Sequence, residues 1–302
     1  MNLFQEEFEL IAMERIRKFA KIAKTMGLDI CLGFSGGKDS QVCYDLCKRA
    51  GVPFKAYFNR SFESPTTFRF IHEHYPDVIW RHEHNYGFIE NIRVVHGGFL
   101  PTVESAYCCK DYKHNPKYVD ACSIVGVRKA ESAKRAQRKT FETKNKTLLK
   151  ANKALVNEYF EEHCQSTGSA SLIQLKPIID WSDNEVWDYI HRHNLPLNPE
   201  YQYAKRVGCI VCPKADFTRN ANNLMKYPKI IDAFIRAREA GRLDIDWIIS
   251  SEGRDCTDDK VYYICRWLNH SFRPFTKRQD ELYKQFREVY NKKKKEELFK
   301  SL

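Results

Sequence analysis

The chain has 302 residues, of which 43% are hydrophobic, so it has room for one sizeable domain and an appended smaller piece. Its net charge is +11, and it has no uninterrupted apolar span long enough to cross a membrane. It has eleven cysteines but shows no signal peptide, so we expect a cytoplasmic protein whose cysteines serve as thiols and not as disulfides.

The N-terminal segment 1–27 is expected to form one amphipathic helix. Its apolar residues recur at helical spacing, namely Phe4, Phe8, Ile11, Ile16, Phe19 and Ile22. Strands are expected near 29–34, 54–58, 77–81 and 122–126, with helices between them. This alternation predicts an α/β fold, a doubly wound parallel sheet of the Rossmann-like kind.

A glycine-rich turn follows the first predicted strand and precedes a helix-like stretch. It reads Ser35, Gly36, Gly37, Lys38, Asp39 and Ser40. The two glycines allow the backbone to approach an anion, the start of the helix presents amide donors, and the lysine adds a positive charge. The spacing differs from that of the common P-loop, because Asp39 and not Ser or Thr follows the lysine. We therefore predict a distinct nucleotide phosphate site.

Two more candidate ligand contacts lie where predicted strands end. Asn59 ends the second strand, and its amide can donate and accept hydrogen bonds. Gly126 ends the fourth strand, so Arg128 lies just past it. Ligands of open parallel sheets bind at the carboxyl ends of the strands, which makes these positions candidate nucleotide contacts.

The segment 128–153 carries much of the positive charge, with ten Lys and Arg residues against two glutamates. We expect it to belong to a basic helical insertion at 129–160. Such a density of cations can bind a polyanion such as a nucleic acid. A solvated helix face and a lid over nucleotide phosphates are equally compatible with it.

Four cysteines form two close pairs, Cys108 with Cys109 and Cys209 with Cys212. Paired thiolates suit an iron–sulfur cluster or zinc, and adjacent cysteines are unusual for structural zinc. A [4Fe–4S] cluster is therefore the favoured interpretation, with zinc and buried unligated thiols as alternatives. Tyr201 precedes the second pair and would either shield the cluster or pack in the core. The remaining cysteines are expected in the core (Cys31, Cys43, Cys47, Cys122, Cys164, Cys256 and Cys265).

Five motifs in this order resemble the cluster-bearing branch of the phosphoadenosine phosphosulfate (PAPS) reductase family, within the PP-loop ATP pyrophosphatase superfamily. They are the segments 35–40, 108–113, 126–132, 177–181 and 208–213. The resemblance covers residues 28–215 and implies an adenine nucleotide alpha-hydrolase-like fold for this range. Residues 216–302 are expected to form an appended C-terminal helical region.

The resemblance also implies roles for individual residues. The turn 35–40 would hold phosphates, and Arg128 would lie near the nucleotide in a loop closed by Glu131 and Ser132. Lys113 would lie close to the cluster and tune its charge. The sequence departs from the family at Asn59, where an acidic residue followed by threonine and glycine is usual.

A second departure concerns the reaction. Reductases of adenylyl sulfate need a nucleophilic cysteine in a C-terminal tail, and the last 30 residues here contain none. Cys256 and Cys265 are the nearest candidates; Cys256 has a flanking arginine that would lower its pKa, but a turn cysteine without a catalytic role is the simpler interpretation.

Three functions stay open. We favour ATP-dependent adenylation and sulfur transfer to an acceptor, assisted by Mg²⁺. The first alternative is an adenylyl-sulfate or phosphoadenylyl-sulfate reductase that releases sulfite. The second is a nucleotide-sensing partner without catalysis. The expected partners are an adenine nucleotide, a protein that donates sulfur or electrons, a nucleic acid, and a second copy of the chain in a homodimer, but no membrane.

Overall fold

The computed structural model describes residues 3–81, 86–114, 122–143, 164–166, 173–239, 267 and 276–300. The described chain divides into two compact units. The first comprises residues 1–60, 65–83 and 112–208, and the second comprises residues 61–64, 84–111 and 209–302. No helix in the described ranges combines the length and the apolar character that crossing a membrane requires.

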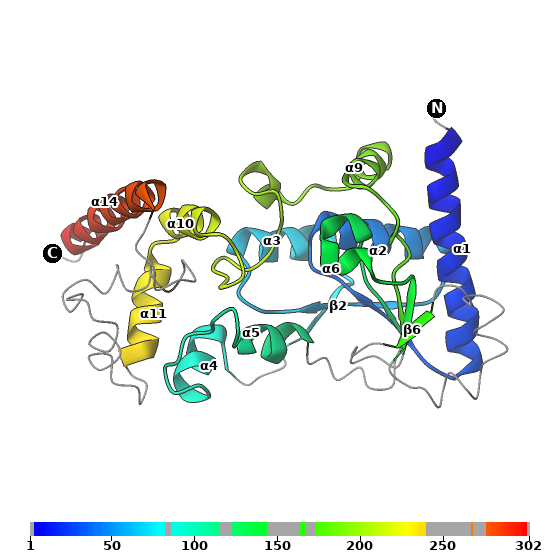
Figure 1. Ribbon diagram of the computed structural model, residues 1–302, viewed down its shortest axis with the longest axis horizontal. Coiled ribbons are helices and arrows are strands. Elements are labelled where there is room, and N and C mark those ends of the chain that lie inside the picture. The colour runs from blue at the N-terminus through cyan, green and yellow to red at the C-terminus, as the bar shows by residue number, and fades with distance from the viewer. Residues whose placement is uncertain are drawn as a thin grey trace. The chain divides into compact units, whose positions relative to one another are not determined.

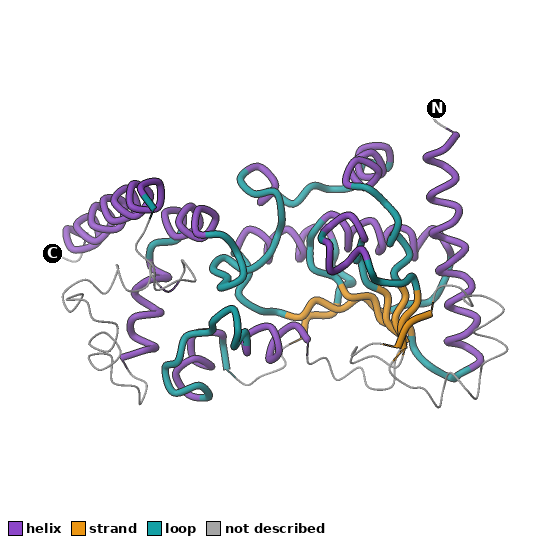
Figure 2. The backbone as a smooth tube through the Cα atoms, in the orientation of Figure 1, coloured by secondary structure: helices purple, strands orange, loops and turns teal. Residues whose placement is uncertain are grey.

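A seven-stranded sheet forms the centre of the first unit (Figure 2). Its strands are β1 (Ile30–Gly33), β2 (Lys55–Asn59), β3 (Ile79–Arg81), β4 (Cys122–Ile124), β5 (Phe141–Thr143), β6 (Cys164–Ser166) and β7 (Ile173–Leu175). Their order is β3-β2-β1-β4-β7-β5-β6, and every neighbouring pair is parallel except β5 with β7. The predicted α/β fold with a parallel sheet is confirmed, and the single antiparallel pair in the described strands is β5 with β7.

Helices cover this sheet in the first unit (Figure 1). They are α1 (Leu3–Thr25), α2 (Lys38–Ala50), α3 (Pro65–His74), α6 (Ala133–Ala136) and α9 (Asp183–Arg192). The predicted amphipathic N-terminal helix is present as α1, and its residues Ile16, Phe19 and Ile22 are fully buried. Helix α2 packs against both α1 and α9. The apolar stripe of α1 therefore joins the main hydrophobic core.

The second unit is helical in its described residues. It contains α4 (Phe88–Val94), α5 (Tyr107–Cys109), α10 (Phe217–Lys226), α11 (Lys229–Glu239) and α14 (Lys277–Lys300). Helix α10 packs against α14, and α11 packs against α4 (Figure 1). Its own core includes Phe234, Phe286 and Leu224, each at most 1% exposed. The predicted C-terminal helical region is thus confirmed in these residues, but segment 84–111 also contributes to the same unit.

The structure differs from the prediction of a helical insertion at 129–160. A 3-10 turn at Lys129–Glu131 and the short helix α6 are followed by strand β5 at Phe141–Thr143, and residues 144–160 lie outside the described residues. Strand β5 forms because Phe141 and Glu142 are both fully buried and pair with β7. The high density of lysine and arginine concealed this short strand in the sequence.

A buried ion pair stabilises strand β5 in the sheet. Lys176 Nζ lies 3.0 Å from Glu142 Oε1, and both side chains are fully buried. Burial lowers the pKa of Lys176 to about 8, although Glu142 acts in the opposite direction. Each charge is therefore tolerated in the core only while its partner is present.

Glu142→Gln is expected to lower the free energy of unfolding by about 3–5 kcal/mol, because it leaves Lys176 buried without its carboxylate. The double variant Glu142→Leu, Lys176→Met should recover most of this loss, since it removes both charges and keeps apolar volume. Chemical denaturation of the three proteins measures both effects. An equal free energy of unfolding for wild type and Glu142→Gln would contradict a stabilising role for this ion pair.

Candidate functional site

The glycine-rich turn connects β1 to the N-terminus of α2, as predicted. Gly36 has φ of +71°, a conformation that side chains disfavour, and an added Cβ would lie 3.1 Å from Ile71. The Gly36 carbonyl accepts hydrogen bonds from the side chains of Gln41 and Asn198 at 3.1 and 3.0 Å. The turn is therefore held rigidly from both sides before any ligand arrives.

The two serines of the turn bond mainly to the turn itself. The Ser35 amide donates to Ser40 Oγ at 3.1 Å, and Ser40 Oγ donates to the Gly37 carbonyl at 2.8 Å. The two hydroxyl oxygens also lie 3.1 Å apart. Their first role is thus to shape the turn, although both line the pocket in front of it.

That pocket has a volume of about 400 Å³ and lies wholly within the first unit. It is lined by Gly33, Ser35, Gly37, Lys38, Asp39, Ser40, Gly126, Val127, Arg128, Ala130, Glu131, Arg135, Asp183, Tyr201, Lys205, Arg206 and Val207. Gly126 approaches the turn so closely that a Cβ there would lie 2.7 Å from the backbone of Asp39. The ends of β1 and β4 therefore meet at one edge of the sheet, where a ligand is expected.

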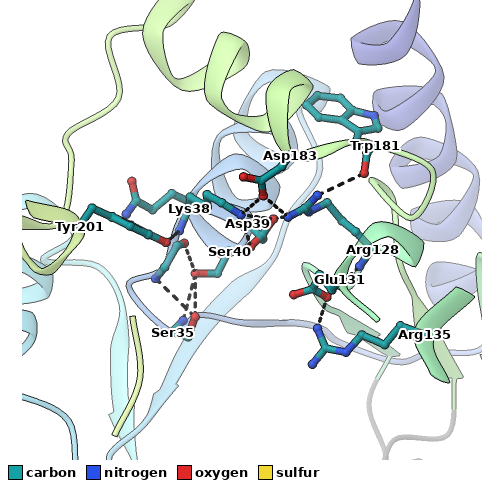
Figure 3. A network of polar contacts seen from close by, with 12 residues as sticks. Ser35, Lys38, Asp39, Ser40, Arg128, Glu131, Arg135, Trp181, Asp183 and Tyr201 are labelled. Atoms are coloured by element: carbon teal, nitrogen blue, oxygen red, sulfur yellow. Dashed lines mark hydrogen bonds and ion pairs between the residues drawn. The ribbon is translucent and has the colours of Figure 1, made fainter. Parts of the chain in front are cut away.

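An ion-pair network fixes the cations of this pocket (Figure 3). Lys38 Nζ lies 2.8 Å from Asp183 Oδ1 and 3.2 Å from Asp39 Oδ2. Arg128 is 2% exposed and pairs with the same two carboxylates, donating through Nη2 to Asp183 Oδ1 at 2.8 Å. Its Nη1 also donates to the Trp181 carbonyl at 3.3 Å. Both cations are thereby oriented, and neither needs to reorganise to meet an anion.

Asp183 is the shared counter-ion of the network. Burial raises its pKa, but hydrogen bonds and charges of Lys38 and Arg128 outweigh burial and lower it overall. It is the first residue of α9, whose start is fixed by a capping box of Ser182 and Glu185. Nothing in the sequence indicated that Asp183 meets Lys38, which lies 145 positions earlier in the chain.

Tyr201 has a contact that the sequence did not indicate. Its hydroxyl oxygen accepts a hydrogen bond from the Lys38 amide at 2.7 Å, at the N-terminus of α2 (Figure 3). Its ring packs edge-on against Trp187. Burial raises the pKa of Tyr201, so its hydroxyl stays neutral. Tyr201 thus supports the phosphate turn at the start of α2.

Three other residues that were predicted to contact the nucleotide do not line the pocket. Gly36 and Asn59 are not among the residues that line the pocket, and neither is Ser132. Ser132 caps α6, where its hydroxyl accepts from the Arg135 amide at 3.3 Å. Glu131 lines the pocket, and its carboxylate accepts from the Arg128 amide at 3.2 Å and pairs with Arg135. The loop from Arg128 to Ser132 is therefore closed on itself, in line with the role expected for Glu131.

The four paired cysteines all lie in the second unit. Each is partly exposed, whereas Cys31, Cys43, Cys47 and Cys122 are buried as predicted. A hydrogen bond with Cys109 raises the pKa of the Cys108 thiol, and burial and the nearby thiols of Cys109, Cys209 and Cys212 raise it further. The other three thiols thus lie close enough to Cys108 to affect its ionisation.

Helix α10 fixes the backbone around the second cysteine pair. The Asn220 side chain accepts from the Cys212 amide at 3.1 Å and donates to the Cys212 carbonyl at 3.0 Å. Asn223 donates to the Ile210 carbonyl at 2.6 Å. On the other side, Ser61 Oγ lies 3.6 Å from Cys209 Sγ. This loop is therefore held rigidly, as a set of ligands requires.

Among the described residues, no three His, Cys, Asp or Glu side chains converge so as to hold a metal ion. A four-iron cluster does not require several side chains to meet at one metal ion, because each thiolate binds its own iron atom around a shared inorganic core. Four thiols in one unit are chemically suitable ligands for such a cluster. Lys113 lies in the π-helical turn Lys110–His114, where the chain passes from the second unit to the first, and its role beside the thiols stays a prediction. Cys256 and Cys265 lie outside the described residues.

Comparison with known proteins supports the sequence resemblance. Residues 29–215 match the profile of the phosphoadenosine phosphosulfate reductase domain. The chain is 27% identical over 219 residues to an uncharacterised protein of Methanocaldococcus jannaschii, covering 67% of this chain and 39% of the relative. It is 25% identical over 180 residues to a sulfate adenylyltransferase subunit 2 of Bacteroides thetaiotaomicron, covering 57% and 59%.

A further relative is an adenosine 5'-phosphosulfate reductase of Allochromatium vinosum. It is 26% identical over 188 residues, which are 62% of this chain and 68% of the relative. The chain therefore spans between two fifths and about two thirds of the length of these curated relatives. Two of the three bear the names of enzymes that act on adenylylated sulfate or form it.

Proposed function

The chain belongs to the phosphoadenosine phosphosulfate reductase domain family, and on this premise we propose that it is an ATP-dependent enzyme of sulfur metabolism. In this proposal it cleaves ATP between the α and β phosphates, adenylates an acceptor and replaces the activated oxygen with sulfur. The observation that carries the proposal is the rigid pocket in which Lys38 and Arg128 share the carboxylates of Asp39 and Asp183.

The pocket supplies positioning and electrostatic stabilisation. In the adenylation step an acceptor oxygen attacks the α-phosphorus, the bond to the β-phosphate breaks, and pyrophosphate leaves with the electron pair. Negative charge develops on the leaving group, next to Lys38, Arg128 and the amides at the start of α2. Hydrosulfide then displaces AMP from the activated atom of the acceptor. Oriented cations favour the first step because they need no reorganisation.

Magnesium would reach this pocket with the nucleotide. Asp39 and Asp183 face the pocket, but each already pairs with Lys38 and Arg128. Mg²⁺ commonly binds through one or two carboxylates together with substrate phosphates. We therefore expect tight magnesium binding only when a nucleotide is present.

The four thiols support the second half of the proposal. Cys108, Cys109, Cys209 and Cys212 would hold a [4Fe–4S] cluster, which when bound would supply iron sites with affinity for inorganic sulfide. Asn220 and Asn223 would keep the second pair in place during cluster assembly.

A second candidate function is reduction of an adenylyl sulfate with release of sulfite. It is favoured by the relative of Allochromatium vinosum that bears the name of such a reductase. This reaction needs a thiol that attacks the sulfur atom, and Cys256 is the candidate. Sulfite release that persisted unchanged in Cys256→Ser would exclude this thiol.

Incubation of the anaerobic protein with ATP and Mg²⁺ tests the main proposal. Water can take the place of the unknown acceptor slowly, so AMP and pyrophosphate should accumulate together. An ordinary ATPase would instead give ADP and inorganic phosphate. Chromatography of the nucleotides separates the two results, and formation of ADP without AMP would overturn the proposed bond cleavage.

A further inference from the structure

The nucleotide pocket has more positive charge than its own carboxylates balance. Five cationic side chains line it, Lys38, Arg128, Arg135, Lys205 and Arg206. Only three carboxylates do so, Asp39, Glu131 and Asp183. The pocket therefore presents a surplus of two positive charges to whatever it binds.

This surplus is localised at Lys205 and Arg206. Lys38 and Arg128 pair with Asp39 and Asp183, and Arg135 pairs with Glu131. No carboxylate in the described part of the chain forms an ion pair with Lys205 or Arg206. Both residues follow the 3-10 turn Pro199–Gln202 that carries Tyr201, so the backbone holds them at the wall of the pocket.

Arg135 and Arg206 both line the pocket, and the charge of Arg206 acts on Arg135. Burial lowers the pKa of Arg135, and the positive charge of Arg206 is the next largest cause in the same direction. Two guanidinium groups that line one pocket and repel each other are stabilised by an anion that contacts both. Their planar donors suit the oxygen atoms of a phosphate group.

We propose that Arg135, Lys205 and Arg206 form a second anion subsite, which binds the phosphates farthest from those held by Lys38 and Arg128. This inference rests on the proposed function and names its substrate class, a nucleoside triphosphate whose phosphate chain reaches both subsites. A nucleoside monophosphate has one phosphate and fills only one of them. The same subsite would retain pyrophosphate after the α–β bond is broken.

Affinity measurements on Arg206→Gln test the subsite. Titration calorimetry with ATP, AMP and inorganic tripolyphosphate should show at least about a tenfold loss of affinity for ATP and tripolyphosphate, since a charge-assisted contact to phosphate is removed. Affinity for AMP should change less than about threefold. Arg206→Lys keeps the charge but loses the planar pair of donors, so its ATP affinity should lie between those of Arg206→Gln and wild type.

Arg69→Gln is the matched control, because Arg69 is exposed on α3 and does not line the pocket. It should bind all three ligands like wild type. An equal loss for ATP and AMP in Arg206→Gln, or no loss for tripolyphosphate, would overturn the subsite. Failure of the proposed function is distinguishable: tripolyphosphate would still bind in an Arg206-dependent manner, but ATP would yield no AMP.

Discussion

Lys38→Ala is expected to lower the rate of ATP-dependent pyrophosphate release by at least about a hundredfold, the usual loss when one preorganised stabilising group is removed. Lys38 Nζ lies between the carboxylates of Asp39 and Asp183 and is 7% exposed. Without it, Arg128 alone would balance two carboxylates, and these would repel the incoming phosphates. Binding and chemistry should therefore both weaken.

Lys48→Ala is the control for this variant. Lys48 lies on the same helix as Lys38, but its side chain is 54% exposed and pairs with Asp77. Pyrophosphate release by Lys48→Ala should match wild type, and thermal unfolding should show that both variants fold. Wild-type pyrophosphate release by a folded Lys38→Ala protein would contradict the role assigned to the turn.

Cys209→Ser is expected to remove most of the iron and acid-labile sulfide from protein purified without oxygen. Serine is a poor ligand for iron in such clusters, and the other three thiols would leave one iron atom exposed. Cys209 is also the cysteine whose backbone is paired with Glu63 and whose sulfur lies near Ser61. Loss of the broad visible absorbance of the cluster would accompany the loss of iron.

Cys31→Ser is the control that separates loss of a cluster ligand from general destabilisation of the protein. Cys31 is buried in strand β1 of the first unit, and burial raises the pKa of its thiol, so it is no ligand candidate. Its iron content should equal that of wild type. Iron-free wild-type protein that instead contains about one zinc per chain would support the zinc alternative and contradict the cluster.

The part of the site that was predictable from sequence is local in the chain. The turn 35–40 is recognisable because a strand, two glycines, a lysine and a helix follow one another directly. Strands β1 to β4 were also recognisable, since each lies in an apolar run bounded by turn residues. Positions defined by neighbours in sequence could therefore be assigned before the fold was known.

The part that was missed depends on distant contacts. Tyr201 meets the Lys38 amide across 163 positions of the chain, and Arg128 meets Asp183 across 55. Strand β5 has three residues and includes Glu142, whose burial makes sense only with Lys176 beside it. Short elements and buried ion pairs leave no periodic signal, so only the folded chain shows them.

Competition between ATP and adenylyl sulfate distinguishes the proposed adenylation from the reductase alternative. The anaerobic protein is incubated with equal amounts of ATP and adenylyl sulfate, together with Mg²⁺ and a thiol reductant, and the products are separated. We expect AMP and pyrophosphate from ATP without release of sulfite. Release of sulfite from adenylyl sulfate while ATP stays intact would contradict the account and establish the reductase alternative.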